Sequence, residues 1–89
     1  MIVEIRLYGA LRRYRPSDAP GAAHQSFTLD LPLGSSVDDV SRRLGIPDGF
    51  VTAAAVNDRA VDTSALLAES DRISLFPPSA GGRLETQGR

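Results

Sequence analysis

Apolar and polar side chains alternate along residues 2–8, which is the clearest pattern near the start of the chain. Val3, Ile5 and Leu7 share one face, and the residues between them are charged. A period of two with β-branched residues predicts a strand that is buried on one face. Gly9 marks the end of this strand.

The same alternation predicts a strand at residues 27–31 and another at residues 72–76. In the second of these, Ile73 and Leu75 point inward and Phe76 points outward. The Pro-Pro pair that follows lacks the backbone donors of a ladder, so the strand must end there. We expect residues 27–31 to pair antiparallel with the opening strand.

Residues 37–44 carry the pattern of a helix. Their apolar positions fall at i, i+3 and i+7, namely Val37, Val40 and Leu44. Ser36 suits the N-cap, with Asp39 as its partner in a capping box. Gly45 suits the C′ position. This segment is expected to be the main helix of the domain.

Weaker signals predict two further strands. Residues 51–56 are rich in alanine, which suits a helix as readily as a strand, but the flanking valines and the turn-prone Asn57-Asp58 favour a strand. Residues 60–62 are a short partner for it. Residues 16–25 are rich in Pro, Gly and Ala, which is typical of a loop.

Two short helical segments complete the expected elements. Residues 10–14 form a short helix that the following proline must stop. A single helical turn is expected to contain Leu66 and Leu67. Its cap is Asp62 or Thr63.

The order of these elements predicts an α+β domain over residues 1–82. It is a mixed sheet of four or five strands with one main helix across one face. The crossover is long enough for parallel pairing of residues 2–8 with residues 72–76. A ubiquitin-like β-grasp meets these conditions, and so do other small α+β folds. Residues 83–89 are expected to be a disordered extension.

Composition excludes much of the catalytic repertoire. The chain has 89 residues, no cysteine and one histidine, and its ten basic residues are all arginine. A Cys nucleophile, a thiolate metal site and a Schiff-base lysine are therefore excluded. We expect no bound metal and no bound cofactor.

Charge and hydropathy limit the classes of partner that we expect for this chain. Residues 16–82 carry four arginines against nine acidic residues, which argues against nucleic-acid binding because that function needs a net basic face. No apolar run approaches the roughly 20 residues that span a bilayer, and no signal peptide is recognisable. We expect a cytoplasmic protein without membrane contact.

Conventional catalytic sites are not apparent. His24 lies in the predicted loop with no acidic residue beside it, and Asp38-Asp39 are explained by the start of a helix. No glycine loop has phosphate-binding spacing. The chain is expected to supply no catalytic groups of its own.

The unusual feature is the segment that leaves the last strand, Phe76-Pro77-Pro78-Ser79-Ala80-Gly81-Gly82. The prolines stiffen its exit from the sheet. The four small residues after them span roughly 13 Å when extended, and glycine lets the backbone approach a catalytic surface closely. Such a tail can thread a partner's channel and present a carboxylate at Gly82. The alternative is a frayed terminus.

This tail resembles the C-terminal signature of the MoaD/ThiS sulfur-carrier family, on the branch of the molybdopterin synthase small subunit. Residues 3–12 resemble the opening strand and first turn of that family, and Val56-Asn57-Asp58 resembles its VN turn. Residues 70–73 resemble its approach to the last strand, with Ser70 where the family often has glycine. The likeness covers residues 1–82.

The resemblance implies a β-grasp fold and a concrete chemistry. An adenylating enzyme of the ubiquitin-activating type would use ATP to adenylate Gly82, and the adenylate would become a thiocarboxylate. The large subunit of molybdopterin synthase would use that sulfur on a molybdopterin precursor. The protein would be a non-catalytic carrier subunit of a sulfurtransferase complex. Gly81 would lie beside the reacting group, and the partner-binding residues would be Leu75, Phe76, Pro77, Pro78, Ser79 and Ala80.

Residues 83–89 depart from this family pattern, because the carriers act through a terminal glycine. An amide-linked Gly82 has no carboxylate to activate. Three explanations stay open: a processing protease trims the chain, the extension is an artefact, or the protein is a ubiquitin-like interaction module without carrier chemistry. A carrier for thiamine, tRNA thiolation or cysteine synthesis is a further alternative.

Overall fold

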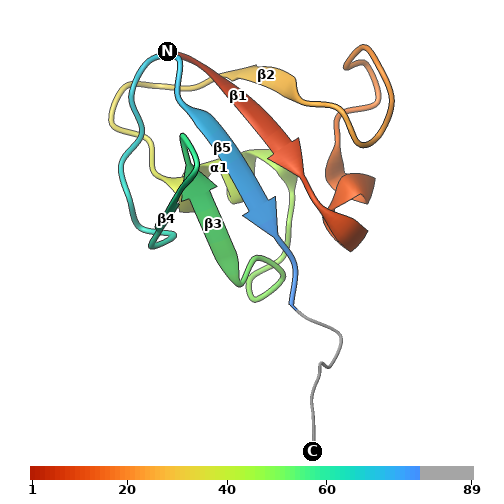
Figure 1. Ribbon diagram of the computed structural model, residues 1–89. Helices are drawn as coiled ribbons and strands as arrows, with labels where there is room; N and C mark the ends of the chain where they lie inside the picture. The colour runs from red at the N-terminus through yellow and green to blue at the C-terminus, as the bar shows by residue number, and fades with distance from the viewer. Residues whose placement is uncertain (79–89) are drawn as a thin grey trace, which may run out of the picture.

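Five strands form one mixed sheet in the computed structural model, which describes residues 1–78 (Figure 1). In chain order the elements are β1 (Ile2–Leu7), the 3-10 helix η1 (Gly9–Tyr14), β2 (Phe27–Asp30), α1 (Val37–Leu44), β3 (Ala53–Val56), β4 (Arg59–Val61) and β5 (Arg72–Phe76). The strand order is β2-β1-β5-β3-β4, and β1 pairs with β5 in parallel. This arrangement is the ubiquitin-like β-grasp, so the predicted α+β fold is confirmed.

The two central strands supply much of the core. Ile5 lies opposite Ile73 and Leu7 lies opposite Leu75 in the parallel ladder. These four side chains and Val3 are each exposed by 1% or less. The alternation predicted for both strands is therefore confirmed, and each such side chain stabilises the fold by about 1.5–3 kcal/mol.

Helix α1 covers the inward face of the sheet and crosses behind it in Figure 1. Both of its ends are those predicted. The Ser36 N–H donates to Asp39 Oδ2 at 2.8 Å, and the Asp39 N–H donates to Ser36 Oγ at 3.3 Å, which completes the capping box. Gly45 ends the helix in the left-handed region with φ 76°. Val37 and Val40, on the side of α1 that faces the sheet, are fully buried.

The predicted helical turn at residues 63–67 is wrong. A helical turn needs the Thr63 carbonyl as acceptor for the Leu67 N–H. In the structure, that carbonyl instead accepts a hydrogen bond from α1. The first two N–H groups of α1 donate to the carbonyls of Ala65 and Thr63, at 3.0 and 2.9 Å. The Leu67 N–H donates to the Ser35 carbonyl instead, and Leu66 forms a β-bridge with Ser36. Leu67 is therefore buried while Leu66 is exposed.

The proposed cap of that turn, Asp62, has a different role. Its carboxylate accepts hydrogen bonds from the Ser64 N–H at 3.0 Å and from Ser64 Oγ at 3.1 Å. The bond from the Ser64 backbone is the main reason why the pKa of Asp62 lies below its ordinary value. Asp62 therefore closes a turn instead of starting a helix.

Other elements differ from the prediction only at their ends or in type. Residues 10–14 lie in a 3-10 helix that begins at Gly9, β2 ends at Asp30, and β3 begins at Ala53. These differences do not change which side chains face the core.

A charge at Val40 is expected to be poorly tolerated. Val40→Asp should lower the free energy of unfolding by several kcal/mol, because a carboxylate would be buried without a partner. Urea unfolding followed by circular dichroism measures this loss. Ser41→Asp places the same charge on the next residue, which lies outside the buried core, and should change the stability by less than about 1 kcal/mol. Equal losses in the two variants would contradict the packing of α1.

The capping box also predicts a pH dependence. The hydrogen bond from the Ser36 backbone is the largest cause that lowers the pKa of Asp39 below 3.8. A depressed carboxyl pKa contributes stability that is fully present above the unfolded-state pKa and is lost as the pH falls through the folded-state pKa. Wild-type stability should therefore fall more steeply below pH 3.8 than that of Asp39→Asn. Denaturation midpoints over this range test it, and parallel curves for the two proteins would refute the assignment.

Candidate functional site

The face of the sheet opposite α1 leads directly to the predicted tail. We call it the outer face. The side chains that β1, β5 and the residue directly after β1 place on this face are Glu4, Arg6, Tyr8, Arg72, Ser74 and Phe76. Glu4 pairs in register with Arg72, and Arg6 with Ser74. A shallow polar hollow of about 130 Å³ lies over these rows. The outer face is therefore polar in its middle and aromatic only at one end.

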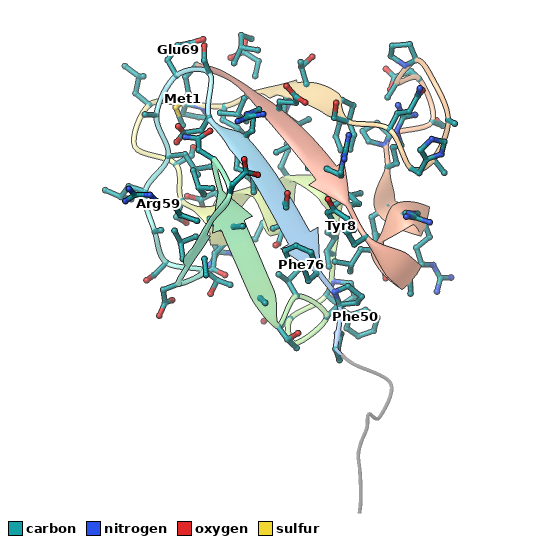
Figure 2. The ribbon with its side chains drawn as sticks, in the orientation of Figure 1. Met1, Tyr8, Phe50, Arg59, Glu69 and Phe76 are labelled. Atoms are coloured by element: carbon teal, nitrogen blue, oxygen red, sulfur yellow. The ribbon has the colours of Figure 1, made fainter. Side chains whose placement is uncertain are left out.

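An aromatic pair marks that end. The rings of Tyr8 and Phe76 are stacked, with centroids 4.7 Å apart and planes inclined by 22°. Figure 2 shows them side by side where β5 leaves the sheet. Both side chains are half-buried, and stacked pairs of this kind contribute about 0.5–1.5 kcal/mol. The outward direction predicted for Phe76 is confirmed, whereas its role in binding a partner stays a prediction.

The first residues of the tail are held by neighbouring segments. We call Phe76, Pro77 and Pro78 the tail root. Thr52 donates twice to it: its N–H to the Phe76 carbonyl at 3.1 Å, and its Oγ1 to the Pro77 carbonyl at 3.1 Å. On the opposite side, a Cβ at Gly9 would lie only 3.0 Å from Pro77 Cγ. The backbone is therefore fixed one residue beyond the end of β5.

An apolar depression of about 480 Å³ adjoins the tail root. Its lining residues are Ala10, Leu11, Gly49, Phe50, Pro77 and Pro78. Phe50 is 46% exposed and lies beside the tail root in Figure 2. Together with the Tyr8–Phe76 pair, this depression makes the region around the tail root the most apolar part of the site.

The residues predicted to bind a partner or to carry the reacting group fall into three groups. Phe76, Pro77 and Pro78 lie together at the tail root, as their sequence requires. Leu75 is corrected: its side chain is fully buried in the core, because it alternates with Phe76, so it offers no surface to a partner. Ser79, Ala80, Gly81 and Gly82 lie outside the described residues, as does the extension at residues 83–89.

Three residues of this region were not predicted as part of a site. Tyr8 shares the outward phase of the opening strand, so the alternation contains a signal for it. Gly9 follows that strand directly and has φ 56°, but a glycine alone does not reveal a contact with Pro77. Thr52 lies 25 positions from its partner Pro77, and no local pattern indicates this contact.

The described residues hold no group of three His, Cys, Asp or Glu side chains that could bind a metal ion. Within residues 1–78, no helix is long and apolar enough to cross a membrane. The arrangement at the tail root is a support for a projecting chain. It brings no acid, base or nucleophile pair together there.

The family of the chain follows from its sequence together with this fold. The sequence model described as the ThiS family matches residues 6–82. The chain belongs to the ThiS family. This confirms the resemblance that the tail motif and the opening strand suggested. No curated protein matches the chain in sequence.

Solved structures agree with the ThiS-family fold. SAMP1 from Haloferax volcanii superposes with a TM-score of 0.62 at 20% identity, covering 92% of this chain and 100% of its own. A putative molybdopterin converting factor subunit 1 from Pyrococcus furiosus gives 0.60 at 21% identity, with coverages of 88% and 98%. A chain in the complex of subunits 1 and 2 of molybdopterin-converting factor from Helicobacter pylori gives 0.55 at 26% identity, with coverages of 92% and 100%.

The contact between Gly9 and Pro77 can be tested with a matched pair of variants. Gly9→Ala should lower the free energy of unfolding by more than Gly34→Ala. Both glycines have positive φ, so both variants have the strain of about 1 kcal/mol or more. Only at Gly9 does the new methyl group meet another residue, whereas nothing lies within 4 Å of a Cβ at Gly34. Urea unfolding measures the difference, and equal losses would show that Pro77 does not pack there.

Proposed function

We propose that the chain is a sulfur carrier of the molybdopterin synthase small-subunit type, with Gly82 as its working terminus after residues 83–89 are removed. One observation carries this proposal. The ThiS-family match ends at residue 82, which is the last glycine of the FPPSAGG motif. The seven residues that follow lie outside the match, so the family likeness ends where the motif ends, which supports Gly82 as the working terminus.

The proposed chemistry takes place at a carboxylate that a partner activates. In an adenylating enzyme, the freed Gly82 carboxylate attacks the α-phosphorus of ATP and pyrophosphate leaves. Sulfide supplied by the partner then attacks the carbonyl carbon of the acyl adenylate, AMP leaves with the bonding electron pair, and a thiocarboxylate remains. ATP is a substrate of the partner, and this chain binds no cofactor. The carrier's own contribution is a stable domain and a narrow, accessible end, because glycine lets the reacting group approach closely.

A large-subunit partner is the second part of the proposal. The similar Helicobacter pylori chain is present in a complex of subunits 1 and 2 of molybdopterin-converting factor, which supports such a partner here. We assign the partner surface to the end of the outer face around the tail root. Tyr8 and Phe76 are half-buried aromatic residues there, and aromatic residues are enriched among those that dominate binding energy at interfaces. The large subunit would receive the sulfur for a molybdopterin precursor.

The extension favours a second candidate function. With Arg83 attached, Gly82 is part of a peptide bond and cannot be adenylated. If the 89-residue chain is the final product, the domain is a ubiquitin-like interaction module without carrier chemistry. The two functions therefore differ at one bond, between Gly82 and Arg83.

Adenylation of defined chain ends separates them. Three forms should be mixed with ATP and an adenylating enzyme: residues 1–89, residues 1–82, and residues 1–82 with a C-terminal carboxamide. Only residues 1–82 with a free carboxylate should support pyrophosphate exchange and yield an acyl adenylate. The carboxamide form is the matched control, since it keeps every residue and lacks only the carboxylate. Failure of residues 1–82 to react would refute the carrier function.

Intact mass spectrometry of the protein from its native cells provides the second measurement. A species that ends at Gly82, together with one in which an oxygen is replaced by sulfur, is expected. A population that consists only of the 89-residue chain would favour the interaction module. A carrier for thiamine, tRNA thiolation or cysteine synthesis would show the same masses, and the acceptor that receives the sulfur would distinguish it.

A further inference from the structure

We propose that Thr52 is a positioning residue for the tail: it fixes the direction in which the tail leaves the domain, and thereby how often Gly82 reaches the active site of the adenylating enzyme. This inference rests on the proposed function. Thr52 belongs neither to the tail nor to the aromatic pair. It acts through the tail root alone.

The geometry at Thr52 extends the hold of the sheet beyond its last strand. The Thr52 N–H binds the Phe76 carbonyl at 3.1 Å, as a ladder donor would. That N–H carries one hydrogen and already binds Phe76, so it does not also serve the next carbonyl of the chain. The Thr52 hydroxyl supplies that second bond, to the Pro77 carbonyl at 3.1 Å. Pro77 is the first residue after β5, and among the described residues this side-chain bond holds its carbonyl from the β3 side.

The β1 side of Pro77 is closed by Gly9. The pyrrolidine ring lies so near that a Cβ at Gly9 would approach Cγ to 3.0 Å. Pro77 is therefore held at its carbonyl by Thr52 and at its ring by Gly9. Because Pro77 and Pro78 both have a fixed φ, the orientation set at Pro77 restricts the path of the chain as far as Pro78, the last described residue.

A small change in the direction of the tail root would cause a larger displacement at the end of the tail. For a tail that enters the partner extended, four residues would span roughly 13 Å, and a change of about 20° at the root would displace their end by about 4–5 Å. Acyl transfer requires reacting atoms to be held near contact distance, and a misplacement of about 1 Å is already costly. The hydrogen bond from the Thr52 hydroxyl is exposed to solvent. Its net contribution to the free energy therefore lies at the lower end of the usual range, which corresponds to about a two- to fivefold change in rate.

Thr52→Val and Thr52→Ser form the matched test. Valine keeps the β-branched shape and the backbone N–H but removes the hydroxyl, whereas serine keeps the hydroxyl. The kinetics of adenylation should be measured on whichever form of the chain, 89 residues or cut after Gly82, the enzyme accepts. Thr52→Val should lower kcat about two- to fivefold with KM for the carrier unchanged, since the docking surface is intact. Thr52→Ser should restore the wild-type kcat.

A second measurement uses the 89-residue chain and no enzyme. The carbonyl carbon of Pro77 should change its chemical shift in Thr52→Val and recover it in Thr52→Ser, because this carbonyl is the acceptor of the hydroxyl bond. A purely structural role would instead lower the melting temperature and leave kcat unchanged.

The outcomes separate the positioning role from the proposed function. Wild-type kcat in Thr52→Val, or a Pro77 carbonyl that does not respond, overturns the positioning role alone. A wild-type chain that is not adenylated in any form overturns the carrier function and the positioning role with it.

Discussion

The parallel pairing of β1 with β5 is the interaction on which the rest of the structure depends. It brings the start of the chain beside the last strand and aligns five fully buried apolar side chains over the helix. β2 then adds to the free side of β1, and β3 adds to the free side of β5. Because parallel strands end at the same edge, this pairing also places Tyr8 beside Phe76 and Gly9 beside Pro77. One ladder therefore builds both the core and the tail root.

The two faces of that sheet have separate tasks. The inner face is closed by α1, whose first N–H groups are satisfied by residues 63–65 and by its capping box. The outer face has no such cover in the described part of the chain, and its apolar surface is concentrated where the tail departs. A domain of this size has little surface to spare. Under the proposed function, it would combine recognition and delivery at one end and leave bond-making to its partners.

The features that the sequence predicted well are those with local causes. The bounds of α1 follow from Ser36, Asp39 and Gly45, all of which lie within one turn of the helix ends. The end of β5 follows from the two prolines. The alternation also placed Leu75 inward, and the structure agrees, although the family resemblance had suggested a surface role for it. Where the two arguments disagreed, the periodicity of the strand was the better guide.

The features that the sequence did not predict depend on distant partners. Residues 63–67 form no helical turn because the carbonyls of Thr63 and Ala65 accept hydrogen bonds from α1, a segment some 25 positions earlier along the chain. Thr52 likewise acquires its contact with Pro77 only when β3 lies beside β5. Alternation and capping are properties of neighbouring residues, so neither pattern contains this information. The role of residues 79–82 is still a prediction, since they lie outside the described part of the chain.

The position of β5 constrains the order in which the domain is synthesised and folded. This strand is the last among the described residues but occupies the centre of the sheet. While the chain is being synthesised, β1 and β3 therefore have no partner between them until almost the whole domain has left the ribosome. Closure must wait for a contact between segments far apart in sequence, which is the slow kind of folding step. The tail emerges immediately after the strand that completes the sheet, so a tail held at Pro77 belongs only to a domain that has already folded.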